Sequence, residues 1–261
     1  MKKKKWSFSS ILLLLVGIAL IVIALVMLIP DLLSRKQAND TYEDLSEAYV
    51  KIEAPITFEE NKEEEVNANW WYEDVVIDME ALQEINPDIV GWIRFDNLEI
   101  ISYPVLYSGD DEKYLRSDIY GNKTTAGCIF IEGANNPDLN DYHTIIYGHN
   151  MKNLSMFGSL RKYKNDGFYE DNQYFTVYLE DRAYRYQIFA YYDVPETDQI
   201  YTIGFGPDDT YQSFIDKMIS RSYKDTGIEV TKTDRVVTLS TCSSEGNRFV
   251  VHAVRVDEYI Y

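Results

Sequence analysis

The sequence predicts a mostly β protein, an eight-stranded barrel with a few short helices that follows an N-terminal transmembrane helix. Three observations lead to this prediction. The chain opens with a long uncharged apolar run, β-rich runs separated by turn residues dominate from Gly91 onward, and helical periodicity is confined to short segments. Many short strands with rare helices are typical of a closed or nearly closed, antiparallel-rich barrel.

The apolar run extends from Ile11 to Ile29 without a charged residue. At about 1.5 Å of rise per residue it reaches roughly 28 Å, close to the hydrocarbon thickness of a bilayer. The alternative is a secretory signal peptide, whose apolar region is shorter and ends in a small-residue cleavage site that is missing before Pro30. Because Lys2 to Lys5 precede the run, we expect a single-pass cell-membrane protein with residues 1–10 in the cytoplasm, an anchor at 11–29 and an extracellular domain.

Residues 30–69 are expected to form a stalk or linker. Tyr42, Leu45, Tyr49 and Ile52 recur at spacings of three or four, which predicts a helix with one apolar stripe. The glutamate-rich stretch 59–65 predicts a solvated linker. The compact domain is then expected to cover residues 70–261.

Within that domain, Asp78 is predicted to cap a short helix that Pro87 ends. Further helices are predicted at 156–163 and 208–222, where apolar residues recur at helical spacing. In the run 183–194, Tyr184 shares one face with the alternate apolar residues, and Arg185 lies on the other. The β-rich runs predict strands at 91–95, 98–107, 127–131, 143–149, 173–179, 183–194, 235–242 and 248–256.

Composition and missing motifs exclude several classes of function. The formal net charge is −18 and the sequence contains no basic footprint outside Lys2 to Lys5, so nucleic acid is not an expected partner. The patterns GxxxxGK[ST], HExxH, CxxC and GxSxG are all missing from the sequence. This argues against most phosphate-binding, zinc-protease and serine-hydrolase functions.

The stretch TLSTCSSEGNR (238–248) raises the main chemical question, because Cys128 and Cys242 are the only two cysteines. Outside the cytoplasm they are able to form one disulfide, and a cysteine in an apolar strand is also a common core residue. The third alternative is a nucleophile. A thiolate at Cys242 needs an imidazole to exchange its proton, and Arg248, across a short turn, would stabilise a thiolate or an oxyanion.

The chain has three histidines, and the residues alone leave their roles open. His143 and His149 face the same side of one predicted strand, which suggests a metal pair that lacks a clear third ligand. His252 shares its strand face with Arg248 and therefore rivals His149 as the partner of Cys242.

TLSTC followed by an arginine, together with IIYGHNM (145–151) and MFGSL (156–160), resembles the sortase family of Gram-positive cell-envelope transpeptidases. YPVLYSGDDEKYL (103–115), AGCIFIEGANN (126–136) and RFVVHAV fit the same family, so the resemblance spans roughly residues 85–256. The helix at 208–222 and the N-terminal stalk resemble class B sortases. Class C pilin polymerases usually carry a second membrane segment near the C-terminus, which is not found here, so class B is expected.

The resemblance implies a sortase-type barrel in which Cys242, His149 and Arg248 are catalytic and His143 and His252 are structural. It implies an enzyme that cleaves the sorting signal of a secreted surface protein after threonine and holds the acyl group as a thioester on Cys242. The acyl group would then pass to an amine of the peptidoglycan precursor, without a metal or organic cofactor.

Further positions match residues that contact the peptide in class B sortases, with departures at Asp111, where the family often has asparagine, and in IEGANN, where relatives often have aspartate. The alternatives are a pilin-assembling sortase, a secreted cysteine peptidase that acts on peptidoglycan peptides, and an adhesion module with Cys242 in its core. The predicted peptide contacts are Ser240, Leu115, Asp111, Thr197 and Tyr201.

Overall fold

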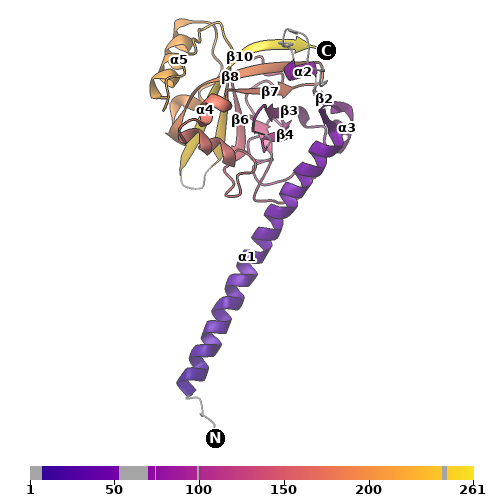
Figure 1. The fold of residues 1–261 in the computed structure, drawn as a ribbon, viewed down its shortest axis with the longest axis vertical. Coiled ribbons are helices and arrows are strands. Elements are labelled where there is room, and N and C mark those ends of the chain that lie inside the picture. The colour runs from indigo at the N-terminus through magenta and orange to yellow at the C-terminus, as the bar shows by residue number, and fades with distance from the viewer. Residues whose placement is uncertain (1–7, 53–69, 74, 99, 243–245) are drawn as a thin grey trace, which may run out of the picture.

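A computed structural model of the chain describes residues 8–52, 70–73, 75–98, 100–242 and 246–261. In this part of the chain, eight strands close into a barrel in the order β10-β8-β7-β3-β4-β5-β6-β9, which confirms the predicted fold class (Figure 1). The barrel strands are β3 (Ile89–Phe95), β4 (Ser102–Leu106), β5 (Ile129–Ile131), β6 (His143–His149), β7 (Tyr174–Tyr178), β8 (Arg182–Pro195), β9 (Val236–Cys242) and β10 (Asn247–Ile260).

Most neighbouring strands of the barrel are antiparallel, but the β4–β5 and β6–β9 pairs are parallel. Strands β7 and β8 form a hairpin, whose turn is closed by the Leu179 N–H donating to the Arg182 carbonyl at 2.7 Å. A parallel pair needs a long crossover connection. The segment between β6 and β9 is such a connection, and it contains the barrel strands β7 and β8 together with several helices.

The predicted helices are present, with one change of type. Asp78 caps α3 by accepting a hydrogen bond from the Ala81 N–H at 3.1 Å, and Asp208 caps α5 in the same way. The predicted helix at 156–163 is a 3₁₀ helix, η1, that begins two residues later. The elements outside the barrel are α1 (Phe8–Tyr49), β1 (Val50–Ile52), α2 (Trp70–Glu73), β2 (Val75–Ile77), α3 (Met79–Ile85), η1 (Gly158–Lys164), α4 (Phe168–Asp171), η2 (Gln199–Tyr201) and α5 (Asp209–Arg221).

Helix α1 is a single long helix that projects away from the barrel (Figure 1). Its segment Leu12–Pro30 has the length and composition to cross a membrane. Its last three turns pack on the barrel through Ala38, Tyr42 and Leu45, which are buried. The predicted stripe ends earlier than expected, because Ile52 lies in β1, paired with Val75 of β2. The expected linker at 59–65 lies outside the described residues.

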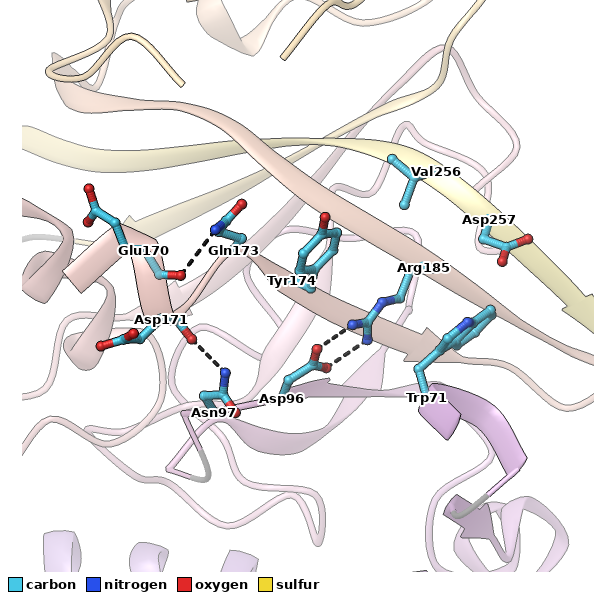
Figure 2. Close-up of a pocket in the computed structure, with 10 residues that line it drawn as sticks. All are labelled: Trp71, Asp96, Asn97, Glu170, Asp171, Gln173, Tyr174, Arg185, Val256 and Asp257. Carbon is cyan, nitrogen blue, oxygen red and sulfur yellow. Dashed lines mark hydrogen bonds and ion pairs between the residues drawn. The ribbon is translucent and has the colours of Figure 1, made fainter. Parts of the chain in front are cut away.

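A buried ion pair joins β3 to β8 across β7. Arg185 has the side-chain direction that strand periodicity predicts, yet only 8% of its side chain is exposed. Its guanidinium makes a two-pronged contact with Asp96, at 2.7 Å for the Nη1–Oδ1 bond, and also donates to Thr176 Oγ1 at 3.1 Å. Trp71 and Tyr174 flank it, with 4.9 Å from the guanidinium carbon to the Tyr174 ring centre. A pocket of about 520 Å³ is lined by Asp96, Arg185, Trp71 and Tyr174 among others. It includes none of the predicted site residues (Figure 2).

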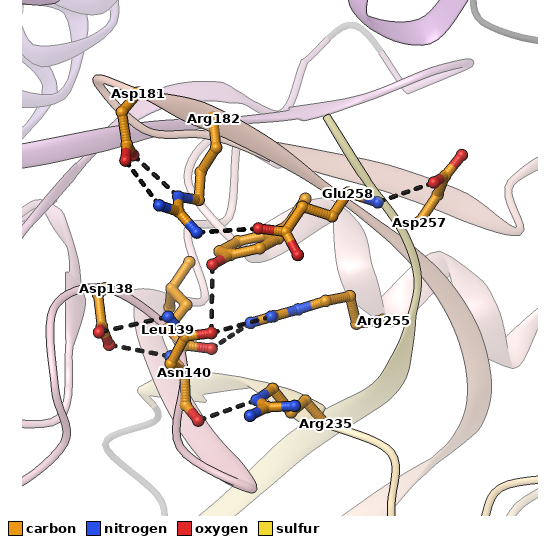
Figure 3. Close-up of polar contacts among 10 residues, drawn as sticks. Asp138, Leu139, Asn140, Asp181, Arg182, Arg235, Arg255, Asp257 and Glu258 are labelled. Carbon is orange, nitrogen blue, oxygen red and sulfur yellow. Dashed lines mark hydrogen bonds and ion pairs between the residues drawn. The ribbon is translucent and has the colours of Figure 1, made fainter. Parts of the chain in front are cut away.

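A second group of polar contacts fastens the β5–β6 connection to the neighbouring strands (Figure 3). The Arg255 guanidinium lies 3.5 Å from the ring centre of Tyr184 on β8 and donates to Asn140 Oδ1 at 3.1 Å. Arg235 Nε donates to the Asn140 carbonyl at 3.0 Å. The connection is thereby held against β8, β10 and the segment that leads into β9.

We predict that replacing Arg185 by leucine lowers the free energy of unfolding by about 3–5 kcal/mol, because Asp96 would remain buried without its counter-charge. Urea denaturation of the two proteins measures this difference. Lys232→Ala is the control: Lys232 pairs with Asp209, whose side chain is 94% exposed, and its loss is expected to leave stability nearly unchanged. Equal effects of the two substitutions would contradict the prediction.

Candidate active site

The parallel pairing of β6 with β9 sets His149 directly beside Cys242. The register runs without a break from His143 opposite Val236 to His149 opposite Cys242, the last residue of β9. Paired strands lie about 4.8 Å apart. Two residues that are 93 positions apart in sequence are therefore adjacent at one end of the barrel.

Strand β10 brings the third predicted residue to the same end. Strands β9 and β10 are antiparallel, with Val250 opposite Ser240, and the same register continued by two residues sets Arg248 opposite Cys242. The Phe249 N–H donates to Thr241 Oγ1 at 2.8 Å, which supports this continuation. Arg248 also forms an ion pair with Glu196, just after β8, at 3.2 Å.

Local packing explains why YGHN and MFGSL occur together. Gly148 has no side chain, and a Cβ there would lie 2.6 Å from the Phe157 ring. Phe157 packs directly on the strand at this point, and its N–H donates to the His149 carbonyl at 3.0 Å. Phe157 thus covers the Gly148 face of the β6 end and holds the backbone of His149 through this hydrogen bond.

The imidazole of His149 is oriented by one backbone carbonyl. Its Nε2 lies 2.6 Å from the Leu115 carbonyl, which only accepts hydrogen bonds, so Nε2 carries a hydrogen and Nδ1 is the nitrogen able to exchange a proton. Burial lowers the pKa of His149, the Leu115 contact opposes this, and the charges of Arg116 and Arg248 lower it further. The imidazole is therefore mostly neutral at pH 7.

The other two histidines are buried on the barrel face that α5 covers, where His143 packs against Phe214 and His252 against Tyr192. His143 has both nitrogens engaged, Nδ1 with the Thr202 carbonyl at 2.8 Å and Nε2 with Thr238 Oγ1 at 2.7 Å. His252 Nδ1 lies 2.8 Å from the same Thr238 oxygen. Burial lowers the pKa of His143 to about 4 and that of His252 well below the ordinary value. Because both are buried, neither can replace His149 as the partner of Cys242. Within the described ranges, no cluster of three or more His, Cys, Asp or Glu residues could hold a metal.

Cys128 is a free, buried thiol, so the disulfide that the sequence left open is not formed. Its Sγ donates to the Ser117 carbonyl at 3.2 Å and accepts from the Tyr42 hydroxyl at 3.3 Å. Burial raises the pKa of Cys128 to about 12, which keeps this sulfur protonated and unreactive.

Three of the five predicted peptide contacts, Ser240, Tyr201 and Leu115, lie on one strip beside His149. Ser240 is the register partner of Tyr147, and both lie two positions before the His149–Cys242 pair, on the same strand face. The Tyr201 hydroxyl lies 3.0 Å from Ser240 Oγ, and its ring stacks on Tyr147 with centres 6.4 Å apart. Leu115, whose carbonyl holds His149, borders this strip.

The remaining two predicted contacts lie further out. Asp111 accepts a hydrogen bond from the Gly133 N–H at 2.6 Å and lies next to Glu132, which accepts from the Tyr147 hydroxyl at 2.7 Å. Burial raises the pKa of Glu132, and the Asp111 carboxylate adds to the increase. Thr197 is exposed in the turn after β8. Asp111 is thus connected to the strip through the neighbouring Glu132 and its hydrogen bond with Tyr147.

Three contributors were missed at the sequence level: Tyr147, Glu132 and Glu196. Tyr147 was detectable, because it precedes His149 by two residues on a strand and so shares its face. Glu132 belongs to IEGANN, the stretch that was noted only as a departure. Glu196 has no local sequence signal, since its meeting with Arg248 depends on the β8–β10 pairing.

Comparisons with known proteins identify the family and the fold. The family model described as Sortase domain matches residues 93–256. Sortase B of Listeria monocytogenes is 37% identical over 169 residues, which cover 64% of this chain and 68% of that protein. The crystal structure of sortase B from B. anthracis in complex with AAEK1 is similar with a TM-score of 0.72 and 30% identity, over 87% of this chain and 99% of that one. The Staphylococcus aureus sortase B–substrate complex gives a TM-score of 0.69 at 27% identity, over 86% of this chain and 99% of that one.

We predict that only one of the three histidines titrates readily in the folded protein. The His149 ring signal should show a midpoint below the ordinary value of about 6.5, because burial disfavours its charged form. His143 should titrate near pH 4, and burial should keep the pKa of His252 well below its ordinary value. Selective ¹³C labelling of histidine and a pH series of NMR spectra measure this. A His149 midpoint above 6.5, or neutral-range titration of His143, would contradict it.

Proposed function

The chain belongs to the sortase family of cysteine transpeptidases and is similar to its class B members, and from this premise we propose how its residues act. Cys242 attacks the carbonyl carbon of the threonine in a C-terminal sorting signal, so that the chain is cut after this threonine. The acyl group is held as a thioester and then transferred to an amine of the peptidoglycan precursor. The observation that carries this proposal is the unbroken β6–β9 register, which pairs His149 with Cys242.

The first half of the reaction forms the thioester. The thiol proton passes to Nδ1 of His149, and the sulfur adds to the carbonyl carbon. When the tetrahedral intermediate collapses, the carbon–nitrogen bond breaks and His149 returns the proton to the departing amine. The lowered pKa of His149 suits this second step, because a destabilised imidazolium gives up its proton readily.

The second half transfers the acyl group. His149, neutral again, removes a proton from the incoming neutral amine as the amine nitrogen attacks the thioester carbonyl carbon. When the carbon–sulfur bond breaks, His149 returns this proton to the sulfur of Cys242 and the thiol is regenerated. Arg248 supplies permanent positive charge for the oxyanion of both intermediates or for the substrate backbone. The ion pair of Arg248 with Glu196 would restrict the directions in which its guanidinium is presented.

We assign the strip of Ser240, Tyr201 and Leu115 to the sorting peptide, with Asp111 and Thr197 as outer contacts. Its position beside His149 supports this assignment, and S. aureus sortase B has been crystallised as a substrate complex. The apolar segment Leu12–Pro30 supports a membrane anchor, with residues 1–10 in the cytoplasm, a stalk at 30–69 and the catalytic domain at 70–261 outside the cell.

Incubating the protein with sorting peptides and candidate amines is expected to give an acylated Cys242 by mass spectrometry. Cys242→Ala should give no acyl-enzyme, and His149→Ala should reduce turnover by at least about 10²-fold, the usual contribution of a general acid–base. His143→Asn is the control, because His143 lies in the core away from Cys242. Full activity of the His149 variant would overturn its assignment.

The same experiment separates the related functions. Peptide hydrolysis that no added amine diverts would indicate a peptidase acting on peptidoglycan peptides. Capture by a pilin lysine in preference to a wall-precursor amine would indicate pilus assembly. Wild-type behaviour of Cys242→Ala in every assay would leave the chain as a binding module.

Tyr201→Phe is expected to raise KM for the sorting peptide about fivefold with little change in kcat, because a typical hydrogen bond contributes about 1 kcal/mol. Steady-state kinetics with a fluorogenic sorting peptide would measure this. Tyr259→Phe is the matched control, since Tyr259 lies at the far end of β10 and stacks on Tyr72. Equal KM values for the two variants would remove Tyr201 from the peptide site.

A further inference from the structure

The end of the stalk helix and the candidate base touch the same piece of backbone. Tyr42 on α1 is buried and packs edge-on against Tyr103 of β4, with ring centres 5.4 Å apart. Its hydroxyl donates to the Gly127 carbonyl at 2.9 Å and lies 3.3 Å from Cys128 Sγ. The contact with Gly127 spans 85 residues of sequence.

Gly127 is also the wall against which the His149 ring rests. Its φ is +58°, a conformation that favours glycine, and a Cβ there would lie 2.9 Å from His149 Cδ2. The same Cβ would lie 2.8 Å from the Leu115 carbonyl, the group that holds His149 Nε2. The Cys128 N–H donates to the Tyr114 carbonyl at 3.0 Å, so the two segments that enclose the imidazole are tied to each other.

We propose that Tyr42 is a positioning residue for His149: by holding Gly127, the stalk helix fixes the wall and the carbonyl that orient the imidazole. The proposal rests on the catalytic role assigned to His149. It links two parts of the chain that the sequence presents as separate, a stalk and a catalytic domain. Displacing α1 would move Gly127 first, and the imidazole and the Leu115 carbonyl pack on that residue.

The test is Tyr42→Phe in the full chain, because phenylalanine keeps the ring contact with Tyr103 and removes only the hydroxyl. We expect kcat for the transpeptidation to fall about fivefold with KM unchanged, since small misplacements of a catalytic group lower the rate without weakening binding. The NMR titration midpoint of His149 should rise by about 0.3 pH unit, because a looser wall relieves the burial that lowers its pKa.

Tyr49→Phe is the matched control. Tyr49 is the last residue of α1, and its hydroxyl makes no hydrogen bond with any of the described residues. The control should leave kcat, KM and the His149 midpoint at wild-type values, and thermal melting of both variants verifies that the fold is kept.

The two readouts separate the two levels of the proposal. The titration needs no substrate, so it tests the link between Tyr42 and His149 even if the assigned reaction is wrong. In Tyr42→Phe, a shifted His149 midpoint with a wild-type kcat would support the link between Tyr42 and His149 and overturn its effect on catalysis. Unchanged midpoint and unchanged kcat in Tyr42→Phe would reduce Tyr42 to an ordinary packing residue and end the inference.

Discussion

The parallel pairing of β6 with β9 is the constraint on which the rest of the site depends. It sets His149 beside Cys242 residue for residue, although the two residues are 93 positions apart in sequence. A slip of one residue would turn every side chain of β6 to the opposite face. The buried His143–Thr238 contact at the other end of the same pair works against such a slip, because it would leave both polar groups unsatisfied.

The sequence predicted the elements far better than their arrangement. Alternation and turn residues located the eight barrel strands, the cap at Asp78 located one helix start, and apolar spacing located the helix at 208–222, because these signals are local. The parallel register was not predictable from periodicity, since pairing across a long crossover depends on the whole barrel. The burial of Arg185 was also not predictable from periodicity, because its partner Asp96 follows a different strand, β3.

The candidate site shows the same division. Cys242 and Arg248 flank one turn, so their proximity followed from the chain itself, whereas His149 was singled out over His252 only through family resemblance. The structure supplies the physical distinction, which is that His252 is enclosed with Thr238 in the core while His149 lies at the strand end. The support from Leu115 and Gly127 had no sequence signal, because it comes from backbone atoms.

The state of Cys128 has a practical consequence for the whole molecule. A sulfur that is enclosed, hydrogen-bonded and protonated up to high pH does not react with alkylating reagents in the folded protein. With Cys242 as the proposed nucleophile, the two cysteines of the chain would be chemically unequal. One equivalent of a thiol-directed electrophile would then count active sites, and an oxidised Cys242 would not form a disulfide with the enclosed Cys128 thiol.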